Sequence, residues 1–347
     1  MVVSIWGGKT PPLLNHRYKH AARIIMPAKE TPMPPTLQDI REAAERIQSH
    51  AHRTPVMTNE SLDQRVGARV YLKCENFQKV GAFKFRGACN AVFSLSDEEA
   101  ARGVATHSSG NHAQALALAA RMRGIAAHIV MPENAPQVKK DAVAGYGGRI
   151  TYCEPTLQAR EATLRRVVES TGSAFIHPYD NERVIAGQGT AALELLADVP
   201  DLDAIIAPVG GGGLLSGTAI SATELKRGIR VLAGEPEMAD DAFRSMQAEK
   251  IIPSTNPRTI ADGLLTSLSE LTFSIIQSRV EGIVTVSEQG IVDSMKFIWE
   301  RAKIVIEPSA AVAIAVLWEK KIDLTGLKVG VILSGGNVDL GKLPWIQ

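Results

Sequence analysis

The feature that most constrains the fold is an alternation of short apolar runs with helix-length segments along most of the chain. The runs lack the polar alternation of a half-exposed strand, which is typical of parallel strands buried on both faces. Strands are expected at 68–75, 104–108, 126–131, 149–153, 174–177, 204–209, 230–234, 283–286 and 328–333. Helices are expected at 36–50, from about 86, from 96 to 102, and at 111–123, 135–146, 156–171, 214–226, 288–303 and 309–321. The pattern predicts an α/β fold of two doubly wound parallel-sheet lobes, with the ligand site between them at the carboxyl ends of the strands.

The length of 347 residues suits two domains. We expect residues 36–102 and 181–347 to form a large domain and residues 103–180 a small, mobile one. Residues 1–35 are basic and rich in proline and lack the apolar core of a signal peptide. They are expected to be a disordered extension or to precede the true start at Met33; a transit peptide is the less favoured alternative.

Composition excludes several classes of function. The net charge of +1 gives no electrostatic case for nucleic acid or a membrane surface as partner. No apolar run reaches the roughly 20 residues that span a bilayer. The three cysteines show no CxxC spacing, which disfavours a disulfide framework or a zinc site and indicates a reducing compartment, by default the cytoplasm.

One lysine has an unusual setting. Lys84 lies between Phe83 and Phe85, just after Gly81 and just before Arg86. Aromatic neighbours can desolvate an amine, lower its pKa and make it nucleophilic toward a carbonyl group. On this stretch alone, an ordinary lysine at a helix start is the better interpretation.

Three loops at expected strand ends change that balance. The loop 106–112, Thr-His-Ser-Ser-Gly-Asn-His, places hydroxyls and backbone N–H groups at a helix N-terminus, where an anion binds well, although a plain helix cap is the alternative. The loop 208–217 has four glycines between a strand and a helix and suits a phosphate. It fits neither a nucleotide P-loop nor GxGxxG, although Glu235 mimics a ribose-binding acid. Ser334 presents a hydroxyl after the last strand.

A nucleophilic lysine, a phosphate loop and a terminal serine together describe a site for pyridoxal phosphate. The runs 81–88, 106–112, 186–190, 208–213, 306–309 and 333–340 resemble those of the fold type II pyridoxal-phosphate enzymes. Within them the chain is similar to serine racemases of the eukaryotic type, and near the threonine, serine and threo-3-hydroxyaspartate dehydratases. The resemblance covers about residues 36–340.

The resemblance implies roles for particular residues. Lys84 matches the lysine that holds the cofactor covalently, and Ser109 a serine on the opposite face of the cofactor. Two proton-handling groups on opposite faces are what inversion at Cα requires, whereas elimination needs only one. The implied cofactor-binding set is Phe83, Lys84, Asn111, Gly210, Gly211, Gly212, Gly213, Leu214, Glu307 and Ser334, with Gly263 and Asn337 nearby. The implied substrate-binding set is Ser108, Ser109, Gly110, Asn111, His112, Arg160 and Thr266.

The resemblance also implies a divalent-cation site with carboxylates from Glu235 and Asp241 and a carbonyl from Ala239. Oxygen ligands of this kind favour Mg²⁺, Ca²⁺ or Mn²⁺ over zinc, while an acidic helix start is the alternative. A homodimer is implied by resemblance only.

The implied activity is that of a serine racemase with L-serine and L-threonine ammonia-lyase activity. Tyr179, Leu265 and Thr266 depart from the racemase pattern of asparagine, lysine and serine, which leaves a threo-3-hydroxyaspartate or threonine dehydratase as the alternative. From other classes, a non-catalytic nucleotide-binding module and a nicotinamide oxidoreductase also remain open. Regulation by ATP, as in animal members, is not assumed.

Overall fold

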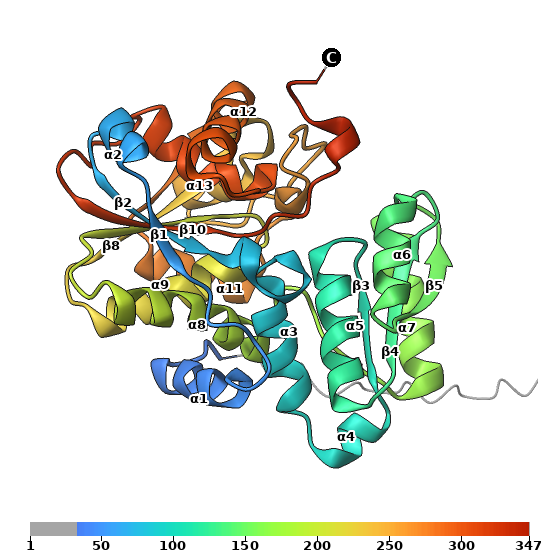
Figure 1. Ribbon diagram of the computed structural model, residues 1–347. Helices are drawn as coiled ribbons and strands as arrows, with labels where there is room; N and C mark the ends of the chain where they lie inside the picture. Colours follow the sequence, from blue (N-terminus) through green and yellow to red (C-terminus); the bar gives the residue numbers. More distant parts are fainter. Residues whose placement is uncertain (1–32, 347) are drawn as a thin grey trace, which may run out of the picture. The chain divides into compact units, whose positions relative to one another are not determined.

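Two sheets organise the part of the chain that the computed structural model describes, residues 33–346 (Figure 1). Residues 1–32, most of the predicted extension, lie outside the described residues. The six-stranded sheet has the order β1 (Val56–Thr58), β2 (Arg69–Cys74), β10 (Lys328–Leu333), β7 (Ala204–Pro208), β8 (Arg230–Pro236) and β9 (Gly282–Val286). The four-stranded sheet has the order β5 (Arg149–Cys153), β4 (Ala127–Pro132), β3 (Val104–His107) and β6 (Ala174–Phe175).

All neighbouring strands pair in parallel except β1, which is antiparallel to β2. The α/β prediction with two parallel sheets is therefore confirmed, with β1 as an unexpected antiparallel edge. The smaller sheet is built from strands between residues 104 and 175, and the larger sheet from strands on both sides of that range. This arrangement agrees with the predicted domain boundaries, which remain a prediction.

The helices between the strands are α1 (Leu37–Ile47), α2 (Glu60–Val66), α3 (Lys84–Phe93), α4 (Asp97–Ala101), α5 (Asn111–Arg123), α6 (Gln137–Gly145), α7 (Leu157–Thr171), α8 (Glu182–Asp198), α9 (Gly213–Leu225), α10 (Asp241–Ala248), α11 (Glu270–Arg279), α12 (Glu288–Phe297) and α13 (Pro308–Trp318). Two of the expected helices begin with capping boxes, at Thr36 and Ser96. In the expected helix 288–303, the α-helical part ends at Phe297, and the next residues, Ile298–Ala302, form a π-helical turn. The helices α2, α8 and α11 were not expected, and α10 was considered only as the alternative to the cation site.

Both faces of the larger sheet are covered, as the apolar strands require. In β7, Ile206 belongs to the core cluster that includes residues of α2, α12 and α13, whereas its neighbour Ile205 belongs to the cluster that includes residues of α8, α9 and α11. Figure 1 shows these two groups of helices on opposite sides of the sheet. Because side chains alternate along a strand, burial of both Ile205 and Ile206 needs a helix layer on each face.

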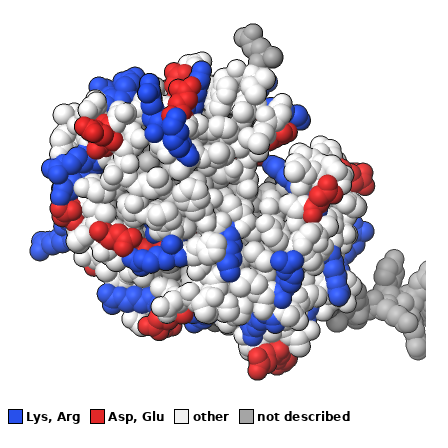
Figure 2. Space-filling model, in the orientation of Figure 1, with Lys and Arg blue, Asp and Glu red and all other residues white. Residues whose placement is uncertain are grey.

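The surface matches the balanced composition. Basic and acidic side chains are interspersed on the face shown in Figure 2. Among residues 33–346, no helix is long and apolar enough to cross a membrane.

Candidate active site

Lys84 is the first residue of α3 and follows β2 through two short 3₁₀ turns, η1 (Glu75–Phe77) and η2 (Lys79–Gly81). Its Nζ donates a hydrogen bond to the carbonyl of Pro178 at 3.1 Å and lies 5.0 Å from the centre of the Phe83 ring. Burial lowers the pKa of Lys84 to about 8, against the opposing effect of the Glu307 carboxylate. An amine with this pKa is partly neutral near physiological pH and can act as a nucleophile or a base.

The glycine loop follows β7 and leads into α9. Gly212, the N-cap of α9, has φ of 84°, and the helix has no side-chain cap. A Cβ on Gly211 would overlap the ring of Tyr179, and one on Gly213 would lie 2.9 Å from the Cβ of Tyr179. The uncapped start of a long helix beside backbone without side chains fits a phosphate group.

Asn111, at the start of α5, contacts the loop after β10 and the start of α13. Its Nδ2 donates to both carboxylate oxygens of Glu307, at 3.2 and 3.1 Å, and its Oδ1 accepts from Asn337 Nδ2 at 2.9 Å. The backbone N–H of Asn337 also donates to Glu307, at 3.2 Å. Burial raises the pKa of Glu307 to about 7, although the hydrogen bond from Asn111 lowers it. The structure thus joins three predicted residues that are far apart in the sequence.

Ser334 and Phe83 are neighbours at the end of β10. The carbonyl of Ser334 accepts a hydrogen bond from the backbone N–H of Phe83 at 2.9 Å, and Ser334 itself is 2% exposed. An isolated antiparallel bridge between Ala82 and Gly335 extends this contact. The end of β10 therefore lies directly beside the turn that carries Lys84.

The polar loop between β3 and α5 is half-buried at Ser108, Ser109 and Gly110, and α5 has no side-chain cap. His112 Nε2 lies 3.1 Å from the carbonyl of Ile176. A carbonyl only accepts, so Nε2 carries the hydrogen. Burial lowers the pKa of His112 to about 3, and the nearby Lys84 lowers it further, so the imidazole is neutral.

Two further predicted substrate residues are less closely tied to this group. Arg160, on α7, is half-buried, and its Nε has no hydrogen-bond partner among the described residues. Thr266 is exposed, and its side chain lies close enough to Tyr179 to oppose the effect of burial on the pKa of the phenol. Among the described residues, neither Arg160 nor Thr266 hydrogen-bonds with Lys84, so their placement in the site remains a prediction.

The residues of the predicted cation site lie between the end of β8, which contains Glu235, and the start of α10, which begins at Asp241. Glu235 accepts hydrogen bonds from the backbone N–H groups of Ala242 and Phe243, at 2.8 and 2.7 Å. Asp241 is 1% exposed, and neither of its carboxylate oxygens makes a hydrogen bond of normal geometry among the described residues, although the side chain of Ser254 lies close enough to lower its pKa. Burial raises the pKa of Glu235 to about 8 and that of Asp241 to about 6.

A buried carboxylate without partners is costly unless it is protonated or neutralised by a cation. The orphaned oxygens of Asp241 therefore fit the predicted Mg²⁺, Ca²⁺ or Mn²⁺ ion. Within residues 33–346, no three His, Cys, Asp or Glu side chains are grouped to hold a metal. The predicted site uses only two carboxylates and a carbonyl.

The sequence did not predict that the segment after β6 contacts Lys84 and the glycine loop. Pro178 accepts the hydrogen bond of Lys84, and the next residue, Tyr179, packs on the glycine loop. Burial raises the pKa of the Tyr179 phenol, so its hydroxyl is neutral at physiological pH. The sequence does contain a signal, because the aromatic residue Tyr179 closely follows the end of a strand. The local sequence does not indicate which loop Tyr179 packs against.

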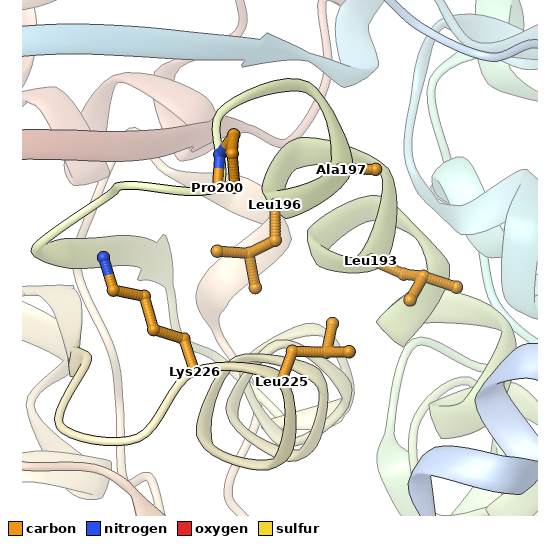
Figure 3. Close-up of a pocket in the computed structure, with 6 residues that line it drawn as sticks. All are labelled: Leu193, Leu196, Ala197, Pro200, Leu225 and Lys226. Carbon is orange, nitrogen blue, oxygen red and sulfur yellow. The ribbon is translucent and has the colours of Figure 1, made fainter.

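A shallow apolar groove of about 230 Å³ lies between the ends of α8 and α9 (Figure 3). It is lined by Leu193, Leu196, Ala197, Pro200, Leu225 and Lys226. None of the predicted site residues lines this groove. It is therefore separate from the group around Lys84.

The α/β fold, together with Lys84, the glycine loop and Ser334, defines the class of pyridoxal-phosphate enzymes. Comparison with known proteins supports the same class. Residues 47–335 match the family of pyridoxal-phosphate dependent enzymes, to which the chain belongs.

Similar proteins place the chain among the serine racemases and hydroxyaspartate dehydratases of that family. It is 53% identical over 311 residues to beta-hydroxyaspartate dehydratase of Paracoccus denitrificans, covering 90% of this chain and 99% of that one. It is 50% identical over 309 residues to L-threo-3-hydroxyaspartate ammonia-lyase of Saccharomyces cerevisiae, covering 89% and 95%. The crystal structure of serine racemase from Dictyostelium discoideum is similar with a TM-score of 0.84 and 51% identity, covering 88% and 99%.

The residues of this chain fit the family's cofactor. The glycine loop leaves backbone and an uncapped helix start for the phosphate, and Lys84 has the lowered pKa that attachment to an aldehyde needs. Ser334, being neutral, would leave the ring nitrogen unprotonated. The individual roles of these residues remain predictions.

Proposed function

We propose that the protein is a serine racemase that also acts as an ammonia-lyase on L-serine and L-threonine. Its products would be D-serine, and 2-oxo acids with ammonia. The observation that carries the proposal is the amine of Lys84, with a pKa of about 8, beside the loops that fit the cofactor and the substrate.

Pyridoxal phosphate, when bound, supplies an electron sink that acidifies the Cα proton of the amino acid. The neutral amine of Lys84 takes this proton from one face. Ser109 returns a proton from the opposite face, which gives the other enantiomer. When the β-hydroxyl group leaves instead, hydrolysis of the dehydrated product gives the 2-oxo acid and ammonia. The backbone N–H groups of the glycine loop would hold the phosphate, and those at the start of α5 would bind the substrate carboxylate.

A second candidate is a dehydratase for threo-3-hydroxyaspartate. Tyr179 and Thr266, which depart from the racemase pattern, lie close to each other, and Tyr179 packs on the glycine loop. A substrate with two carboxylates needs a second cationic group, and the half-buried Arg160 has an unpartnered Nε to offer. Two of the similar proteins are named for such substrates.

The experiment that tests both candidates incubates the enzyme separately with L-serine, D-serine, L-threonine and threo-3-hydroxyaspartate. Oxo acid and enantiomers are measured in the same samples. Serine racemisation with pyruvate formation supports the first candidate, whereas activity confined to threo-3-hydroxyaspartate supports the second.

The role of Ser109 is tested by Ser109→Ala. We expect racemisation to fall by roughly 10² to 10⁴, the usual contribution of a positioned acid or base, while elimination continues. Racemisation at the wild-type rate in this variant would mean that Ser109 is not the second proton donor.

We further propose a cytoplasmic homodimer that binds a divalent cation through Glu235, Ala239 and Asp241, with no nucleic-acid or membrane partner. The unpartnered carboxylate of Asp241 supports the cation, and the balanced charge supports the exclusions. Sedimentation of the purified protein would test the dimer.

A further inference from the structure

The loop that carries Lys84 is fixed by contacts with other parts of the chain. It leaves β2 at Glu75, passes through Val80 and Gly81 with φ of 56° and 69°, and enters α3 at Lys84. The helix has no side-chain cap to fix its first turn. Asn337 and Gly336 hold the apex of the loop through the carbonyls of Val80 and Gly81, at 2.7 and 2.9 Å.

An ion pair between Glu75 and Arg86 joins the two ends of the same loop. Arg86 Nε donates to Glu75 Oε2 at 2.7 Å, and Arg86 Nη2 donates to Glu75 Oε1 at 2.9 Å. Both side chains are fully buried. A bidentate guanidinium–carboxylate pair fixes direction as well as distance, which one hydrogen bond does not.

The remaining hydrogens of Arg86 tie this base to the rest of the large sheet and to α8. Its Nη1 and Nη2 donate to the two carboxylate oxygens of Glu194, each at 2.8 Å, and Nη1 donates to Thr190 at 3.1 Å. Lys73 donates to Glu194 at 2.6 Å, and Thr54 donates to Glu75 at 2.5 Å. The two cations and two anions of this network balance.

Arg86 and Glu194 keep their charges despite burial. Burial alone would lower the pKa of Arg86, but Glu75 and Glu194 outweigh this effect and raise it. Burial raises the pKa of Glu194, but the hydrogen bonds and charges of Arg86 and Lys73 outweigh it, so this pKa is lowered. A buried ion pair is weak evidence for stability in general, because desolvation offsets the attraction. The fixed geometry of the Glu75–Arg86 pair therefore indicates a role other than stabilising the fold.

We propose that the Glu75–Arg86 pair is a positioning device for Lys84, holding the first turn of α3 so that the lysine amine stays beside Pro178. This inference rests on the proposed function only in taking Lys84 as the attachment point of the cofactor. Residues two apart on a helix point to different sides, so Arg86 can be anchored behind the turn while Lys84 faces the site. Small misplacement of a reacting group costs much in rate, of the order of 10²-fold for about 1 Å.

The test compares Glu75→Gln with Glu194→Gln. Glutamine has the shape of glutamate but cannot form the bidentate ion pair. Glu194→Gln is the matched control, since it removes a charge from the same network on α8, outside the loop. For each variant, cofactor-free protein is mixed with pyridoxal 5′-phosphate and the rate of Lys84 attachment is followed by visible absorption. Urea unfolding of the same samples gives the stability.

We expect both variants to lose stability, and Glu75→Gln alone to lose attachment rate, by tenfold or more. Glu194→Gln should attach the cofactor within about twofold of the wild-type rate. Attachment at the wild-type rate in Glu75→Gln, or equal slowing in both variants, would overturn the proposal. If Glu75→Gln does not fold, Glu75→Asp, which keeps the charge on a shorter side chain, is judged by the same criteria. Attachment does not depend on the amino-acid substrate, so this outcome is separate from the substrate assays of the wild-type enzyme.

Discussion

Replacing Glu307 by glutamine should remove a defined part of the pH dependence of stability. The carboxyl group of Glu307 is 4% exposed, and its pKa is raised from 4.5 to about 7, chiefly by burial. Between these two pH values the folded protein holds a proton on Glu307 that the unfolded chain has released. Stability contributed by Glu307 is therefore full below about pH 4.5 and is lost as the pH rises to about 7.

The size of the effect follows from the difference between the two pKa values. Each pKa unit is worth about 1.36 kcal/mol, so the full loss is about 3 kcal/mol. Urea unfolding of cofactor-free wild type and Glu307→Gln, from pH 4.5 to 8, gives the free energies of unfolding. The wild-type value minus the variant value should fall by up to about 3 kcal/mol across this range, since other titrating groups are common to both proteins.

A control variant is Glu300→Gln, at an exposed position on the π-helical turn. Its difference from wild type should stay constant across the same pH range. A constant difference for Glu307→Gln as well would refute the reasoning, because Glu307 would then titrate alike in the folded and unfolded chains.

Three further outcomes are expected. The attachment rate of pyridoxal 5′-phosphate to cofactor-free enzyme should rise with pH through a midpoint of about 8, the pKa of Lys84; a midpoint near 10.5 would contradict the lowered pKa. The variant Lys84→Ala should give no lysine–cofactor absorption band. Gly211→Ala should lose about 1–3 kcal/mol in urea unfolding because its methyl overlaps Tyr179, whereas Gly282→Ala, which has open space, should lose less; equal losses would count against the packing argument. Asp241→Asn should be at least as stable as wild type in chelator, because it removes a buried carboxylate. At Ca²⁺ or Mg²⁺ concentrations of 100 times Kd, only wild type should gain unfolding free energy, by about 2.7 kcal/mol; an equal gain in both would exclude Asp241 as a ligand.

Some elements that the sequence did not indicate have physical reasons. The helix α8 contains Gly187 and Gly189, which normally weaken a helix. In the folded chain these glycines allow close packing, since a Cβ on Gly187 would lie 2.6 Å from the carbonyl oxygen of Arg86, and one on Gly189 would lie 2.9 Å from that of Gly217. Tertiary contacts thus stabilise a helix that its own sequence makes doubtful.

The sequence by itself determined the α/β class, most strands and helices, and the three loops at strand ends. These features depend on local properties: apolar runs, helix caps at Thr36 and Ser96, and glycines where a strand meets a helix. The local sequence around Lys84 left a nucleophilic role as only one possibility. The loops elsewhere in the chain made that role the better interpretation.

Only the tertiary structure decided which of these parts meet. It placed Glu307 between Asn111 and Asn337, set Tyr179 on the glycine loop, and closed the loop of Lys84 with the Glu75–Arg86 pair. Such contacts depend on the order of strands in the sheets and on burial, which lowers the pKa of Lys84 and raises that of Glu307. Neither strand order nor desolvation is a property of a local stretch of residues, so the lysine was visible in the sequence and its environment was not.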